Sequence, residues 1–196
     1  MKTLMALAVV AATAGGAQAG TVFSDNFSGY GTNTILNATN AVFAPNWVTL
    51  SGSVDYLAAG SSFEYLCNTG TNCIDLDGST GQGGVFSTVQ SFAAGTYKLS
   101  VAIFGNRRGA ANDVVTIVLG SFSTVLNLAS GADGSGTFTF TTTGGNLSFA
   151  NAGGDNQGAI LQSVQLSSVP VPAAAPLLAG GLGLLAMVRR RARKSA

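Results

Sequence analysis

Short runs of alternating apolar and polar residues fill the middle of this chain. The alternation is clearest in Tyr97–Ile103 and Thr137–Thr141, where every second side chain is apolar. Successive side chains of a strand point to opposite faces, so both runs predict half-buried antiparallel strands. The other runs are rich in Val, Ile, Phe and Thr and are separated by Gly, Asn, Asp and Ser. The full set of predicted strands is Thr21–Phe27, Trp47–Tyr56, Ile74–Leu76, Val85–Phe92, Thr96–Phe104, Val114–Leu119, Ser121–Leu128, Thr137–Thr142, Asn146–Ala150 and Ile160–Ser167.

These strands predict an all-β protein. No stretch of this region has the roughly 3.6-residue apolar period of an amphipathic helix. About ten strands, spaced by roughly 8 to 12 residues, indicate a jelly-roll-type β-sandwich of two sheets around one core. We expect one domain over residues 20–168, which a chain of 196 residues can hold together with short terminal segments.

The N-terminus has the features of a secretory signal peptide. Lys2 precedes an apolar run from Leu4 to Ala12, and Ala17-Gln18-Ala19 has the small-x-small pattern that signal peptidase recognises. The apolar run is too short to cross the hydrocarbon of a bilayer, which argues against a retained N-terminal anchor. We expect residues 1–19 to be removed and the mature chain to begin at Gly20.

The C-terminus predicts one marginal transmembrane helix. Residues 173–188 carry no charge, and a helix over them would cover about 24 Å of the roughly 30 Å of hydrocarbon. Terminal cations are costly to translocate, so they should stay in the cytoplasm as a stop-transfer cluster while the body lies outside. The cluster consists of Arg189, Arg190, Arg191, Arg193 and Lys194.

Residues 169–196 resemble the PEP-CTERM family of sorting signals in its VPLPA variant. The motif is Val169, Pro170, Val171, Pro172 and Ala173, followed by a Gly/Leu-rich stretch and the Arg cluster, and Val171 stands where Leu is typical. The resemblance implies a Gram-negative bacterium whose exosortase recognises the motif and cleaves nearby. The tail would then hold the protein transiently at the inner membrane before the body reaches the cell surface or extracellular matrix. A permanently anchored periplasmic domain is the alternative.

Composition removes several classes of mechanism. The chain has no His, which excludes Ser-His-Asp and Cys-His catalysis and His-ligated metal sites. Its 2 Cys residues cannot form a four-thiolate zinc site. Residues 20–168 carry three basic and eight acidic side chains, a net charge of −5. So few cations cannot hold a phosphate backbone, and we expect no nucleic-acid partner.

Cys67 and Cys73 lie six positions apart in a segment that export would place in an oxidising compartment. We predict a disulfide between them, which would contribute about 2 kcal/mol by closing a small loop in the unfolded chain. Two independent thiols are the alternative.

The body also resembles the galactose-binding-like sandwich modules of DUF642-type and related PEP-CTERM proteins, over about Phe23 to Leu166. The matching segments are Asn46–Val48, Ser51–Tyr56, Ile74–Ser79, Phe92–Ser100, Gly105–Gly109 followed by Asp113, and Gly153–Gly158. Such modules often end in Leu-Asp-x-Val, whereas this chain has Gln162 at the Asp position. An Asp that can contribute to a structural cation site is therefore missing. The resemblance implies a fold and a location more than an activity.

Two acidic segments are candidate calcium sites. Asp75 and Asp77 stand two positions apart, so both carboxylates can share a hard cation from one strand face. An EF-hand is excluded because Phe86 occupies its twelfth position. Gly153–Asn156 matches one fragment of a calcium-binding β-roll without a repeat. The alternative for both segments is a strand end entering an Asx-stabilised turn. We expect no cofactor apart from this calcium candidate.

Arg107 and Arg108 are the only basic pair in the body and lie in a Gly-bounded turn. Arg108 can join two loops by pairing with Asp155 or Asp113, since guanidinium binds carboxylate at two points. The same group can instead bind sugar hydroxyls at the rim of the sandwich. The candidate residues for either role are Asn106, Arg108, Asp113, Asp155 and Asn156.

No catalytic constellation stands out. The acidic residues of the body include a single Glu, Glu64, and no evident aromatic sugar platform flanks them. Trp47, the only Trp, is more typical of a sandwich core. We therefore expect a non-enzymatic, exported binding or structural module, with extracellular polysaccharide as its candidate ligand. An envelope hydrolase is the less favoured alternative.

Overall fold

A computed structural model describes residues 19–39, 45–67, 70–109 and 111–170 of this chain. Residues 19–169 form a compact unit. The signal sequence with Ala17, most of the sorting motif, the predicted span and the Arg cluster lie outside the described residues. Within the described part of the chain, no helix is long and apolar enough to cross a membrane.

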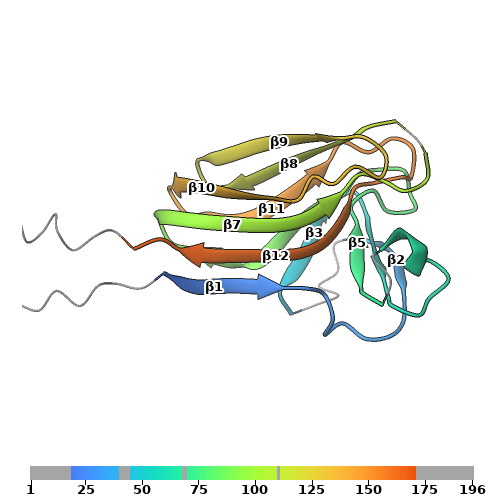
Figure 1. Ribbon diagram of the computed structural model, residues 1–196, viewed down its shortest axis with the longest axis horizontal. Coiled ribbons are helices and arrows are strands. Elements are labelled where there is room, and N and C mark those ends of the chain that lie inside the picture. The colour runs from blue at the N-terminus through green and yellow to red at the C-terminus, as the bar shows by residue number, and fades with distance from the viewer. Residues whose placement is uncertain (1–18, 40–44, 68–69, 110, 171–196) are drawn as a thin grey trace, which may run out of the picture. The chain divides into compact units, whose positions relative to one another are not determined.

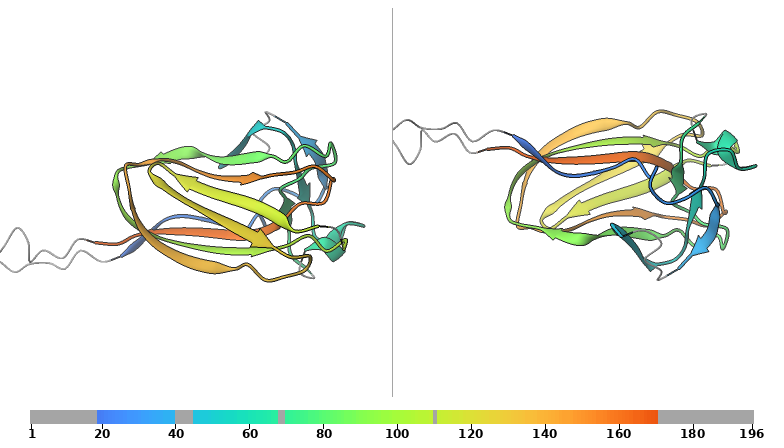
Figure 2. Two further views of the ribbon diagram at one scale, coloured as in Figure 1. Left: turned by 90° about the horizontal axis from the view of Figure 1, so that it is seen from above. Right: turned by 90° about the horizontal axis from the view of Figure 1, so that it is seen from below.

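The described residues form two antiparallel β-sheets packed face to face (Figures 1 and 2). One sheet has seven strands in the order β10-β7-β12-β5-β4-β2, with β1 also paired to β12. The other has five strands in the order β3-β6-β11-β8-β9. The elements are β1 (Gly20–Asp25), β2 (Ile35–Ala38), β3 (Trp47–Ser51), β4 (Val54–Leu57), the 3-10 helix η1 (Glu64–Leu66), β5 (Cys73–Asp75), β6 (Val85–Phe92), β7 (Gly95–Phe104), β8 (Asp113–Leu119), β9 (Phe122–Leu128), β10 (Gly136–Thr142), β11 (Gly145–Asn151) and β12 (Ile160–Ser168).

Strand β12 connects the two ends of the sandwich. One of its edges pairs with β7, while the other pairs first with β5 at Ile160 and Leu161 and then with β1 at Val164–Ser168. Gly20 is therefore opposite Ser168, and both lie at the end of the sandwich away from β5 and η1 (Figure 1). The nine residues of β12 run from the end of the sandwich that holds β5 to the end that holds Gly20 and Ser168, and they span about 26 Å.

Trp47 lies in a cluster of aromatic side chains in the core. Trp47 is fully buried and stacks on Phe86 with ring centroids 4.4 Å apart. Its indole N–H donates to Asp25 Oδ2 at 2.9 Å, so the polar edge of the ring is satisfied inside the core. Phe23 and Phe27 contact the same indole. The prediction that Trp47 is a core residue is confirmed.

The alternating patterns are confirmed where they were clearest. Along β7, Tyr97, Leu99, Val101 and Ile103 are all buried while Lys98 is exposed. On β10, Phe138 and Phe140 are half-buried and pack against the core, and the alternating Thr137, Thr139 and Thr141 are exposed.

Three differences from the predicted strands have local causes. The predicted strand Trp47–Tyr56 is two strands in different sheets, because the chain turns at Gly52 with a φ of 64°. Strand β1 ends at Asp25 rather than at Phe27, whose φ is 60°. Strand β2 was not predicted, since its four residues are mostly exposed and show no alternation.

Candidate functional site

Three loops meet at the end of the sandwich that holds β5, and we call this region the loop end. It comprises residues 76–84, 105–112 and 152–159, with residue 110 outside the described part (Figure 1). Backbone hydrogen bonds hold the first and third loops together, from Gly154 N to Gly81 O at 3.1 Å and from Leu76 N to Ala159 O at 3.0 Å. The candidate residues from Asp75 to Asn156 gather here.

Asp75 is buried and fully engaged by protein donors. Its Oδ2 accepts a hydrogen bond from Arg108 Nη2 at 2.6 Å, and its Oδ1 accepts from the backbone N–H groups of Asp77 and Gly158 at 3.1 and 3.0 Å. Burial raises the pKa of Asp75 above its ordinary value, and the charge of Arg108 opposes this by lowering it. A guanidinium therefore occupies the position beside Asp75 that the calcium hypothesis assigned to a metal ion.

The partner predicted for Arg108 needs correction. Arg108 pairs with Asp75 rather than with Asp113 or Asp155. Asp113 is instead held by Asn106, whose backbone N–H and side-chain Nδ2 donate to Asp113 Oδ2 at 2.6 and 3.1 Å. Asn106 is itself fully buried. Arg108 thus links its loop to β5, and Asn106 with Asp113 fixes the base of that loop.

Asp155 and Asn156 lie exposed at the tip of the third loop. Asp155 Oδ1 accepts a hydrogen bond from Gln157 N at 3.1 Å, which is the Asx turn considered as the alternative for this segment. Asn156 adopts a positive φ of 61°, which Asn tolerates better than most residues.

A cavity of about 260 Å³ opens at the loop end and is lined by Asp77, Asp113, Asn151 and Asp155 among other residues. Burial raises the pKa of Asp77, and the nearby Asp155 carboxylate raises it further, while backbone N–H groups of residues 155–157 lower it. Burial likewise raises the pKa of Asp113, with smaller contributions in the same direction from Asp155 and Asp77. The cavity is therefore an acidic, partly desolvated site.

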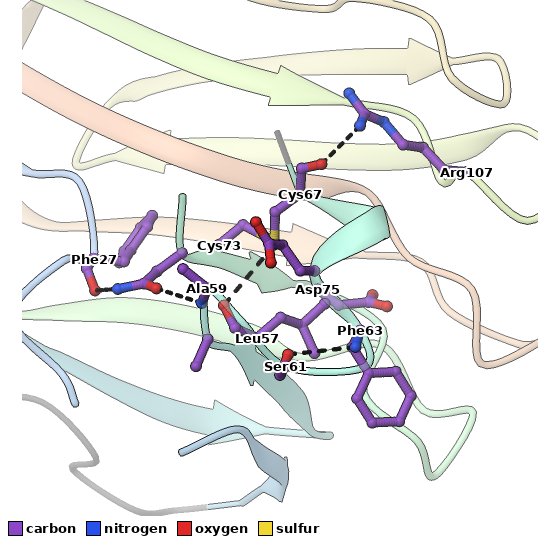
Figure 3. Close-up of a disulfide and its surroundings, with 12 residues drawn as sticks. Phe27, Leu57, Ala59, Ser61, Phe63, Cys67, Cys73, Asp75 and Arg107 are labelled. Carbon is purple, nitrogen blue, oxygen red and sulfur yellow. Dashed lines mark hydrogen bonds between the residues drawn. A yellow bond between two sulfur atoms is a disulfide. The ribbon is translucent and has the colours of Figure 1, made fainter. Parts of the chain in front are cut away.

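The Cys67–Cys73 disulfide is present, as predicted, and closes a loop beside η1 (Figure 3). The backbone carbonyl of Cys67 accepts a hydrogen bond from Arg107 Nη1 at 2.8 Å. Glu64 holds the same loop: its Oε2 accepts from Gly60 N at 2.8 Å and its Oε1 from Gly70 N. These donors lower the pKa of Glu64, opposite to the raised pKa of a catalytic general acid.

The segment just before the disulfide-closed loop carries two exposed aromatic side chains that were not predicted from the sequence. Tyr65 is 63% exposed and Phe63 is 37% exposed, and Figure 3 shows Phe63 pointing away from the disulfide. The available signal was two aromatic residues two positions apart, just before a Cys-closed loop. Elsewhere in the described residues, the large hydrophobic side chains that are clearly exposed are aliphatic.

A second cavity, of about 430 Å³, adjoins the disulfide loop. Gly70, Thr71 and Asn72 of that loop line it, and so do Asn26, Ser28, Gln162 and Ser163. All the polar side chains that line this cavity are uncharged amides or hydroxyls. Among the described residues, no group of three or more His, Cys, Asp or Glu side chains is placed to hold a metal ion by itself.

No protein-family model matches the chain, and no curated protein matches it. Solved structures do match. One is the CBM22-1 and GH10 modules of endo-1,4-β-D-xylanase 10B from Clostridium thermocellum, complexed with xylohexaose, with 13% identity and a TM-score of 0.50 over 77% of this chain and 29% of that one. At this identity the likeness shows the fold alone, and it confirms a jelly-roll β-sandwich like those of carbohydrate-binding modules.

Two further matches are isolated modules. A family 35 carbohydrate-binding module from Clostridium thermocellum is 11% identical with a TM-score of 0.40, and the match covers 70% of this chain and all of that one. The C-terminal CBM6 of LamC, a laminarinase from Zobellia galactanivorans, is 13% identical with a TM-score of 0.38 over 69% of this chain. The conclusion on the fold rests on the xylanase match, of which this chain spans less than a third.

Proposed function

We propose that this chain is an exported, non-catalytic β-sandwich that binds a glycan through the loop carrying η1. The observation that carries the proposal is the exposure of Tyr65 and Phe63 just before the loop that the Cys67–Cys73 disulfide closes. Ligand sites combine apolar and aromatic surfaces with a few placed polar groups, and a sugar ring presents both kinds of surface. The likeness to a xylanase chain that contains a carbohydrate-binding module supports the same class of ligand.

The loop is held in place before any ligand arrives. Besides the disulfide and Glu64, Asn72 bridges two segments: its Oδ1 accepts from Ala59 N at 2.7 Å and its Nδ2 donates to Phe27 O at 3.0 Å. A rigid loop loses less conformational entropy on binding, which favours affinity for a flexible sugar chain.

The adjoining cavity supplies the polar part of the site. Its amide and hydroxyl groups come from Asn26, Ser28, Asn72 and Ser163, so donors and acceptors are both present without a formal charge. A neutral oligosaccharide presents the same mixture of hydroxyl donors and acceptors. The polar groups and the aromatic residues lie on or beside one loop, residues 58–72, which favours a single binding surface.

The other carboxylates near the core serve as structural acceptors, which favours binding over catalysis. Asp25 accepts from Trp47 Nε1 and from Asn46 Nδ2, at 2.9 and 3.1 Å. Asp55 accepts from Asn37 N at 2.7 Å and from Ser79 Oγ at 2.8 Å. A hydrolase would have to use the acidic cavity of the loop end. Release of reducing sugar from xylohexaose by the purified protein would support that alternative.

Export and sorting by an exosortase are part of the same proposal. The predicted cleavage after Ala19 and the predicted sorting motif at residues 169–173 bracket the compact unit, so their removal leaves every described strand in place. An oxidising envelope compartment also suits the disulfide. Ser168, the last residue of β12, lies at the end of the sandwich away from η1 (Figure 1).

Two experiments test the proposal. The full chain, expressed with its own signal and tail in a Gram-negative host that has an exosortase, is fractionated and its mature C-terminus determined by mass spectrometry. Loss of the tail supports sorting, whereas an intact tail with Arg189 in the membrane fraction favours a permanent anchor.

The exported protein is then applied to an array of xylan, β-1,3-glucan and galactan oligosaccharides. Tyr65→Ala should weaken any binding at least about tenfold, and Tyr65→Phe, which keeps the ring, should not. Val125→Ala changes a 59% exposed residue of β9, in the other sheet from β5, and is the surface control. Absence of binding on the whole array, or equal binding by Tyr65→Ala, would refute the glycan site.

A further inference from the structure

The acidic cavity of the loop end contains buried oxygen atoms without hydrogen-bond donors. Asp77 is 0% exposed, and neither of its carboxylate oxygens accepts a hydrogen bond. Asn151 is 8% exposed, and its Oδ1 also lacks a donor. The backbone N–H groups of residues 155–157 point toward Asp77 and lower its pKa as weak, long hydrogen bonds, but none reaches ordinary hydrogen-bond geometry. Buried acceptors of this kind are rare in native proteins and call for a partner.

That partner is not a protein cation. None of the described residues that line the cavity is basic. Arg108 is engaged by Asp75, and Arg107 donates to the carbonyl of Cys67 on the disulfide loop. The charged side chains that line the cavity are all acidic, and they are those of Asp77, Asp113 and Asp155.

The donor set matches the preference of one ion. Calcium takes six to eight oxygen ligands and accepts carboxylates, Asn carbonyls, backbone carbonyls and water together. Asp77 supplies carboxylate oxygens from two positions beyond the end of β5, Asn151 supplies an amide oxygen from the end of β11 in the other sheet, and Asp155 supplies a third oxygen group from the loop after β11. Magnesium is less suited, because it demands a regular octahedron and retains its waters.

The backbone lets the third loop close over Asp77. Gly153 has a φ of 68°, and a Cβ on it would lie 3.3 Å from Asp77 Oδ1 and 2.2 Å from the backbone N of Gly83. A Cβ on Gly158 would lie 2.7 Å from Asp77 Cβ. Only glycine at these positions allows the chain to run this close to the carboxylate, which places the loop within reach of an ion bound there.

We propose that this cavity binds a calcium ion, held by the Asp77 carboxylate and Asn151 Oδ1, closed by Asp155 and completed by backbone carbonyls and water. The ion would cross-link the ends of β5 and β11 and the loop between β11 and β12. The site differs from the Asp75–Asp77 pair expected from the sequence, since Asp75 is engaged by Arg108. Asp113, whose Oδ2 is held by Asn106, contributes negative charge at the rim. The site does not depend on the glycan proposal.

The test is a calcium titration of the full exported protein after treatment with EDTA and gel filtration. Isothermal titration calorimetry with CaCl₂ should show one site, and added calcium should raise Tm while equimolar magnesium raises it less. Asp77→Asn should abolish the calcium response. Because it also removes a buried unpaired charge, it should not lower the Tm of the calcium-free protein.

Two further variants keep the result interpretable. Asp155→Asn changes an exposed residue, so it should fold normally, and it should weaken calcium binding at least about tenfold. Asp133→Asn changes an exposed acid outside the cavity and should leave calcium binding unchanged.

Two outcomes would overturn the calcium proposal. One is the absence of heat and of any Tm shift at millimolar calcium, and the other is wild-type calcium affinity in Asp155→Asn. Asp77 would then serve only to anchor the loop of residues 152–158. Array binding that persists in EDTA would leave the glycan proposal intact.

Discussion

Arg108 donates a hydrogen bond from Nη2 to Asp75 Oδ2 at 2.6 Å and thereby joins the loop between β7 and β8 to the end of β5. The two residues are 33 positions apart in sequence. The Asp75 side chain is 2% exposed and that of Arg108 is 26% exposed, so the carboxylate is inside and the guanidinium lies at the boundary with solvent. The pair positions the loop that carries Asn106 and leads to Asp113 at the start of β8, beside the acidic cavity.

Arg108→Ala should destabilise the protein, because it leaves the buried Asp75 without its cation. We expect a loss of about 1–3 kcal/mol in the free energy of unfolding by urea, less than for a fully buried pair because Arg108 is partly solvated. Lys98→Ala, on the exposed face of β7, is the control and should change stability by less than about 0.5 kcal/mol. Equal stabilities for both variants would mean that solvent replaces the guanidinium without cost.

The partner of Arg108 shows what local sequence could and could not predict. Alternation along β7 identified the buried face of that strand, because period-two burial is a local property. Whether Arg108 pairs with Asp75, Asp113 or Asp155 depends on how three loops meet. The spacing of these residues along the sequence does not determine that. The exposure of Tyr65 is equally non-local, since an aromatic residue is exposed or buried according to what packs on it.

Gly52 explains why one predicted strand became two. A Cβ at this position would lie 2.1 Å from the backbone O of Gly83, in addition to the strain of a φ of 64°. The sequence shows a glycine within an apolar run, but the backbone that leaves no room for a side chain there, at Gly83, lies 31 positions later.

Gly52→Ala should therefore cost about 2–5 kcal/mol of stability, the sum of left-handed backbone strain and overpacking against a backbone atom. Gly131→Ala is a matched control, because Gly131 has a φ of 67° and open space where its Cβ would be. It should lose only the backbone strain, about 1–2 kcal/mol. Urea unfolding of both variants measures the difference in stability. Similar losses of stability would show that the backbone near Gly83 moves readily to make room for the added Cβ.

Tyr30 should stay protonated well into the alkaline range. Burial raises the pKa of its hydroxyl, and the hydrogen bond it donates to Asp25 raises it further. The folded protein then binds this proton more tightly than the unfolded chain, whose Tyr titrates near pH 10. The stability contributed by this group is complete below pH 10 and is lost as the pH rises above it.

Absorbance at 295 nm tests this, because it follows tyrosinate formation. Wild type and Tyr30→Phe should give the same absorbance change between pH 9 and the onset of alkaline unfolding. Above about pH 10, the stability of wild type should fall relative to Tyr30→Phe. A larger absorbance change in folded wild type than in the variant would show that Tyr30 ionises at an ordinary pH.

The disulfide should matter more for binding than for stability. Closing a seven-residue loop contributes about 2 kcal/mol in the chain-entropy model, so Cys67→Ala with Cys73→Ala should fold but unfold at lower urea. The double variant leaves β5 paired to β4 and β12, while the loop that displays Tyr65 loses its covalent restraint and keeps the hydrogen bonds of Glu64, Asn72 and Arg107. Binding of a ligand must then also offset the entropy of ordering that loop, so glycan affinity should fall severalfold even in conditions where the protein is fully folded.

Calcium binding at the acidic cavity should be unchanged in the same double variant, because none of the residues that line the cavity belongs to the disulfide loop. If both affinities fell together, the loop would be coupled to the whole loop end, and the disulfide would act on the fold rather than on one site.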